Sequence, residues 1–79
     1  MEIVRVLRWY DKSEEHLVDE CTLKGISVHE LQIIFCEDEE NPMYDCYSVE
    51  TKQACEIKKY CDVEFNFSKY DYFVESYSI

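Results

Sequence analysis

Cysteine, histidine and carboxylate side chains are the groups in this sequence that could perform catalysis. A thiol beside an imidazole would be a nucleophile, and paired carboxylates could act as general acid and base. The chain has five cysteines and two histidines, but His16 falls in an expected strand and His29 in an expected helix, with no third group to orient either. With eighteen acidic residues, some carboxylates pair by chance. These residue types therefore predict a protein that is not an enzyme.

Metal and cofactor sites find equally little support in the residue spacing. The stretch EDEENPMYD is acidic but lacks the alternating ligands and central glycine of a calcium-binding loop. No two cysteines are spaced C-x-x-C, as paired zinc ligands often are. The single glycine cannot build a glycine-rich phosphate loop. We expect no metal, no cofactor and no small-molecule substrate.

Acidic residues adjacent to tyrosines form the pattern that best fits a function. Tyrosine is enriched at the centres of protein interfaces, because it buries a large area and keeps a polar tip. Carboxylates beside it can pair with lysine or arginine of a basic partner. The predicted partner-contacting residues are Asp11, Glu37, Asp38, Glu39, Glu40, Tyr44, Asp45, Tyr47, Tyr70 and Asp71. The alternatives are a solvated acidic loop and, for Tyr47, Tyr72 and Phe73, an equal expectation of core positions; Trp9 fits the core better than an interface.

Charge and size both favour binding over catalysis. A chain of 79 residues forms one domain, residues 1–79, with a thin core, and a catalytic pocket would occupy much of that interior. The net charge of -10 disfavours direct binding to nucleic acid or to an anionic membrane. It favours a cationic partner, whose association it would accelerate. Solubility alone is the competing explanation of the acids.

The five cysteines indicate a reducing compartment. Their number is odd, and the N-terminal stretch MEIVRVLRWYDK shows no secretion signal. No apolar run is long enough to span a membrane. We expect a cytoplasmic protein whose cysteines are reduced and mostly buried as small hydrophobic residues.

The first half of the chain predicts a hairpin followed by a helix. Residues 2–10 and 16–23 have the composition and alternation of two strands, joined by the polar turn 11–15, although the second strand does not show which side faces inward. Ser27 and Glu30 form a capping-box pattern before a one-sided helix that ends near Cys36. The acidic run then follows the helix C-terminus, where the helix dipole disfavours negative charge.

The second half predicts one more helix and two more strands. Residues 43–49 fit either a short strand or an isolated bridge. Residues 50–61 have helical spacing, with Ala54, Ile57 and Cys61 on one side. The alternation at residues 63–67 and the segment 72–77 predict the last two strands. The expected fold class is α+β: a small antiparallel sheet of about four strands with two short helices on one face.

Two short segments resemble a known family. The stretch LRWYDKSEE, residues 7–15, resembles the first strand and turn of the immunity proteins of cloacin-type ribonuclease bacteriocins. The stretch DYFVESY, residues 71–77, resembles their final strand. The central part differs, because that family is richer in glycine there and this chain has a capped helix and cysteines. The chain also resembles small acidic proteins that protect bacteria from contact-dependent toxins.

These resemblances imply an inhibitor that binds a basic cognate toxin, a nuclease domain, and blocks its active site or its access to RNA. The acidic run would mimic substrate phosphates or steer the encounter, and the tyrosines would anchor the complex. Three alternatives remain: an adaptor or regulator for another basic protein, a small structural domain without a toxin, and a cysteine-dependent enzyme or thiol sensor.

Overall fold

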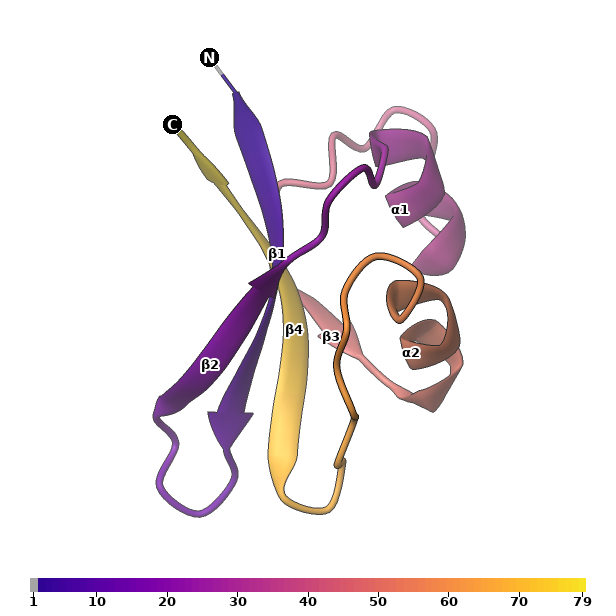
Figure 1. Ribbon diagram of the computed structural model, residues 1–79. Helices are drawn as coiled ribbons and strands as arrows, with labels where there is room; N and C mark the ends of the chain where they lie inside the picture. Colours follow the sequence, from indigo (N-terminus) through magenta and orange to yellow (C-terminus); the bar gives the residue numbers. More distant parts are fainter. Residues whose placement is uncertain (1) are drawn as a thin grey trace.

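A computed structural model describes residues 2–79 as a four-stranded antiparallel sheet with both helices on the same side (Figure 1). The elements are β1 (Ile3–Asp11), β2 (Leu17–Thr22), α1 (Val28–Ile34), β3 (Tyr47–Val49), α2 (Thr51–Ile57) and β4 (Tyr70–Ser78). The strand order is β2-β1-β4-β3, so the first and last long strands lie together at the centre. The expected α+β fold class is confirmed.

The register of β1 against β4 divides the side chains between two faces. Leu7 is paired with Val74 and Trp9 with Tyr72, and these four residues belong to the core or pack against it, beneath the helices. Because side chains alternate along a strand, the pairs between them point to the opposite side. We call that opposite side, which the helices leave uncovered, the open face. It carries Val4, Val6, Arg8, Tyr10, Glu20, Thr22, Asp71, Phe73, Glu75 and Tyr77.

The core lies between the sheet and the two helices. Leu31 of α1 and Ala54 and Ile57 of α2 are buried in it with Leu7 and Val74 of the sheet. Full burial of one such large aliphatic side chain stabilises the fold by about 1.5–3 kcal/mol. As expected, Trp9 packs against this core. The fold thus buries one sheet face beneath the helices, whereas of the residues on the open face Val6 is the one that is fully buried.

Helix α1 begins and ends with defined caps. The Ser27 hydroxyl accepts a hydrogen bond from the Glu30 amide at 3.1 Å, and the Glu30 carboxylate accepts one from the Ser27 amide, which confirms the capping box. At the other end Cys36 adopts a φ of 55°. The amides of Cys36 and Glu37 donate to the carbonyls of Ile33 and Gln32, which is a Schellman motif. The acidic run therefore starts where the helix stops.

The strand predicted at residues 63–67 is wrong. This segment is irregular, although Val63, Phe65 and Phe67 are half-buried and pack against the core while the residues between them are exposed. The alternation that suggested a strand is present, but β3 occupies the place beside Tyr72–Val74 of β4, where a strand at residues 63–67 would pair. Instead, the Asn66 amide donates a hydrogen bond to the Tyr72 hydroxyl oxygen at 2.8 Å.

Two further expectations need correction. The second helix ends at Ile57, four residues before the predicted end at Cys61, although Cys61 still reaches the core. The cysteines are not mostly buried, because only Cys61 is buried and Cys21 half-buried. The other three lie at the end of α1, before β3 and on the outer side of α2, and they are exposed free thiols: Cys36, Cys46 and Cys55.

Candidate protein-binding surface

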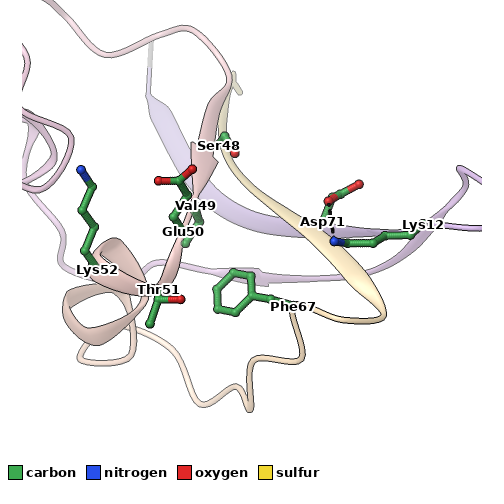
Figure 2. A pocket seen from close by; sticks show the side chains of 8 residues that line it. All are labelled: Lys12, Ser48, Val49, Glu50, Thr51, Lys52, Phe67 and Asp71. Carbon is green, nitrogen blue, oxygen red and sulfur yellow. Dashed lines mark ion pairs between the residues drawn. The ribbon is translucent and has the colours of Figure 1, made fainter.

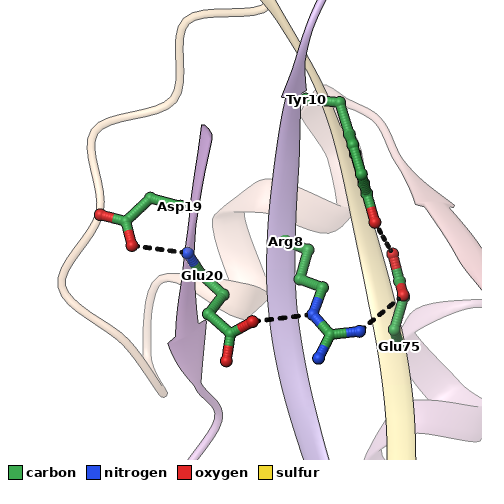
Figure 3. A network of polar contacts seen from close by, with 5 residues as sticks. All are labelled: Arg8, Tyr10, Asp19, Glu20 and Glu75. Carbon is green, nitrogen blue, oxygen red and sulfur yellow. Dashed lines mark hydrogen bonds and ion pairs between the residues drawn. The ribbon is translucent and has the colours of Figure 1, made fainter. Parts of the chain in front are cut away.

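A charged network joins three strands across the open face (Figure 3). Arg8 of β1 donates to Glu20 of β2 at 2.9 Å and to Glu75 of β4 at 3.0 Å. The Tyr10 hydroxyl donates to the second oxygen of Glu75 at 2.8 Å. Since both Glu75 oxygens have partners and the carboxylate is only partly exposed, this network holds its side chains in a single arrangement.

The contacts within this network raise the pKa values of Arg8 and Tyr10. Hydrogen bonds to Glu20 and Glu75 raise the pKa of Arg8, which stays charged. The hydrogen bond to Glu75 raises the pKa of Tyr10, because ionising the phenol would break it and place two anions together. In the adjacent turn, hydrogen bonds from the Ser13 hydroxyl and from the Ser13 and Glu14 amides lower the pKa of Asp11.

Aromatic rings lie beside the charged groups on this face. Tyr10 and Phe73 meet edge to face, with ring centroids 5.8 Å apart. The Arg8 guanidinium lies 5.8 Å from the centre of the Tyr77 ring. Next to them is a hollow of about 380 Å³ lined by Tyr10, Asp11, Glu15, Cys46, Asp71, Phe73 and Glu75. Two of the predicted contact residues, Asp11 and Asp71, are therefore brought together here on neighbouring strands.

The acidic run lies in a different place. It follows α1, on the helix side and away from the β1–β2 turn (Figure 1). The buried Gln32 side chain donates to the carbonyls of Glu39 and Asn41, so the loop has a defined shape. Two of its acids have local partners: the Asn41 side chain donates to Glu37 and the Glu40 amide donates to Asp38.

The predicted tyrosines have separate roles. Tyr47 packs against Phe35 at 5.3 Å, and its hydroxyl lies 3.2 Å from the Asn41 side-chain nitrogen. Tyr70 is half-buried and contacts Tyr72 edge to face. Tyr44 is exposed, with the Arg5 guanidinium 5.4 Å from the centre of its ring, and its neighbour Asp45 is also exposed. The predicted residues thus form two groups and not one continuous patch.

Sequence analysis missed the centre of the open face, which consists of Arg8, Tyr10, Phe73 and Glu75. Alternation along the two strands could have predicted which of these residues share a face. Val4, Val6, Arg8 and Tyr10 lie on one side of β1, and Asp71, Phe73 and Glu75 lie on one side of β4. Without strand order, however, those two sets could not be placed side by side.

Another hollow, of about 610 Å³, lies beside the start of α2 (Figure 2). Its walls carry Lys12, which pairs with Asp71 at 3.6 Å, and Lys52 beside Glu50 and Thr51. Within residues 2–79 no three histidine, cysteine or acidic side chains gather as metal ligands do. No helix in that range has the length and hydrophobicity needed to cross a membrane.

The fold and this surface define a class: a small acidic α+β domain with helices on one sheet face and an aromatic, carboxylate-rich opposite face. The chain belongs to the family described as Domain of unknown function (DUF7683), which matches residues 4–75. No curated protein matches the chain.

Proposed function

We propose that this protein is an immunity protein, a non-enzymatic antitoxin that binds a basic cognate toxin domain, specifically a ribonuclease, and neutralises it in the cytoplasm. It needs no cofactor and does not touch nucleic acid itself. The net charge of -10 steers the basic domain to the protein, and aromatic and acidic side chains then make the contact.

The observation that carries this proposal is the chemistry of the open face. A stable interface needs about 800 Å² on each partner, which is roughly a sixth of the total accessible surface of 5242 Å². On the open face, Tyr10 and Phe73 are aromatic anchors, and carboxylates surround them. The Arg8–Glu75 network holds part of the surface in place before binding, which lowers the entropy lost on association.

An adaptor that binds another basic protein is the second candidate function. The same net charge and open face would support it, since neither specifies a toxin. The two functions differ in outcome: an immunity protein restores growth to cells that make the toxin domain, whereas an adaptor does not.

The test of this interface is a pair of matched substitutions at exposed or half-exposed apolar side chains. Phe73→Ala removes an open-face ring, and Ile33→Ala removes an apolar side chain that is 64% exposed on the helix side. The partner in this test is the C-terminal domain of the protein encoded by the neighbouring reading frame, which we propose is the toxin domain. We expect Phe73→Ala to weaken binding by about 30-fold or more, as loss of an interface hot spot does, and Ile33→Ala to leave affinity unchanged. Equal affinities of both variants would place the interface elsewhere.

A further inference from the structure

Beyond Val74, strand β4 has no paired strand on its outer side within residues 2–79, and the segment before β3 lies beside it, where the Ser76 hydroxyl donates to the Met43 carbonyl at 3.2 Å. β3 pairs only with Tyr72, Phe73 and Val74, whereas β4 continues to Ser78. The backbone amides and carbonyls of Glu2 and Ile79 are hydrogen-bonded to each other, so the amide and carbonyl of Ile79 point toward β1. Because these groups alternate along a strand, those of Ser76 and Ser78 point away from β1. Across residues 2–79, no backbone hydrogen bond is made to them from that outer side.

A groove runs along this free edge. It has a volume of about 540 Å³ and is lined by Ile3, Tyr44, Ser76, Tyr77 and Ser78. Tyr44 forms one wall, and this residue is 57% exposed. Arg5 positions this wall, because its guanidinium stacks on the Tyr44 ring and donates to the carbonyls of Pro42 and Met43. An unpaired strand edge therefore lies beside an open, largely apolar groove, and Tyr77 joins the groove to the open face.

The opposite edge of the sheet is protected against strand pairing. On β2 the Asp19 carboxylate accepts the Glu20 amide hydrogen at 2.8 Å, so this outward-facing donor is already occupied (Figure 3). Charged residues on an edge also discourage pairing with another chain. The end of β4 reads Ser-Tyr-Ser-Ile and has neither device. The outward-facing Glu20 donor is thus already bonded, whereas no side chain within residues 2–79 accepts a hydrogen bond from the Ser76 or Ser78 amide.

We propose that this free edge of β4 receives an extended segment of the toxin domain, which adds to the sheet as a strand antiparallel to β4 and in line with β3. This inference rests on the proposed function and specifies how the partner binds. Backbone hydrogen bonds to Ser76 and Ser78 provide the attachment, and an apolar side chain of the segment lies between Ile3 and Tyr44. A second copy of this chain is a poorer occupant, because two chains of net charge -10 repel each other, whereas a basic segment is attracted.

Hydrogen exchange of individual amides tests this binding mode. The free protein and its complex with the toxin domain are compared by NMR. We expect exchange at the Ser76 and Ser78 amides to slow by about 100-fold or more in the complex, as paired strand amides do. The Glu20 amide, on the protected edge, is the internal control and is expected to keep its rate.

A matched pair of variants provides the second readout. Ser78→Pro removes the outward-facing amide hydrogen and is compatible with an edge strand, since β1 does not use that group. Ser78→Ala keeps the amide and is the control. We expect the proline variant to bind about tenfold more weakly and the alanine variant to bind like the natural protein, with equal melting temperatures.

The outcomes separate this inference from the proposed function. A tight complex in which the Ser76 and Ser78 amides exchange as in the free protein overturns the added strand alone. The same holds if Ser78→Pro dissolves a dimer of this chain and leaves the toxin complex intact. If no complex with the toxin domain forms, the proposed function and this inference both fail.

Discussion

At the scale of single residues, Glu75 and Tyr72, three positions apart on β4, show how residues of one strand have opposite roles. Glu75 faces the open side, where Arg8 and Tyr10 satisfy its two oxygens. Tyr72 is buried on the core side, in contact with the rings of Trp9, Phe65 and Phe67. Along the central strand β4, side chains thus alternate between the core and the open face.

Tyr72→Phe tests the buried hydroxyl. It keeps the ring contacts but leaves the Asn66 amide without its acceptor. We expect the free energy of unfolding to fall by about 1–2 kcal/mol, because the part-buried Asn66 amide loses its hydrogen-bond acceptor. Urea unfolding measures this change, and Tyr70→Phe is the control, as no hydrogen bond is formed by the Tyr70 hydroxyl within residues 2–79. An unchanged midpoint for Tyr72→Phe would contradict the role of this bond.

Cys61 gives stability a dependence on pH. Burial, with the Cys21 thiol beside it, raises the pKa of Cys61 to about 12. In the unfolded chain a cysteine ionises near pH 8.5. Because the folded state holds the proton more tightly, its contribution is complete below pH 8.5 and is lost as pH rises toward 12. We expect the melting temperature to fall over this alkaline range, and to fall less in Cys61→Ala. Cys55→Ala, which changes an exposed thiol, is expected to follow the natural protein; identical pH profiles for all three would contradict the assignment.

At the scale of elements, local sequence rules predict the N-terminal cap of α1 but not its C-terminal cap. The capping box could be predicted because Ser27 and Glu30 have their usual spacing. The Schellman motif could not, because a cysteine occupies the left-handed position that glycine usually takes. Cys36 therefore bears backbone strain at the point where the acidic run begins.

Two glycine substitutions with opposite expected signs test this cap. Cys36→Gly relieves a φ of 55° and should stabilise the fold by about 0.5–1 kcal/mol, after the extra entropy of glycine in the unfolded chain is included. Cys55→Gly, inside α2, should destabilise it by about 0.3–0.5 kcal/mol. Thermal unfolding under reducing conditions measures both. A loss of stability in Cys36→Gly would show that the cysteine side chain stabilises this turn.

The elements also show how far sequence can predict this fold. Strong alternation and capping residues gave β1, β2 and α1 to within about two residues, in line with the usual uncertainty of element ends. The error at residues 63–67 has a different origin, because alternating burial there matches that of a strand. Only the order of strands, which depends on long-range pairing, decides that Tyr47–Val49 takes the place beside β4. The same missing information kept Arg8, Phe73 and Glu75 out of the predicted contact surface.

At the scale of the whole molecule, charge acts over distances that individual contacts do not. The acidic run lies on the helix side, and the carboxylates of the open face belong to the other side of the sheet. Salt screens exposed charges beyond about 8 Å at physiological ionic strength and beyond about 30 Å at 0.01 M, so the fields of the two groups add at the distances of an encounter when salt is low. The run can therefore speed association without forming the centre of the interface.

Charge reversal separates these two effects. In Glu39→Lys with Glu40→Lys, two exposed side chains of the acidic loop change sign. Asp62→Lys with Glu64→Lys makes the same change of net charge at exposed positions in the irregular segment between α2 and β4. At low salt we expect the first variant to associate several-fold more slowly than the second, with a weaker dependence on salt, and both to dissociate at the natural rate. Stopped-flow mixing with the toxin domain measures these rates. Equal association rates would show that net charge alone matters.

The most direct measurement of the central claim is cell growth. The domain encoded by the neighbouring reading frame, which we propose is the toxin, is expressed under an inducible promoter with and without this protein, and the pair is then purified together. We predict that the domain arrests growth alone, that co-expression restores growth, and that the two proteins co-purify in a complex weakened by salt. Growth arrest that persists despite abundant folded protein would contradict the immunity function.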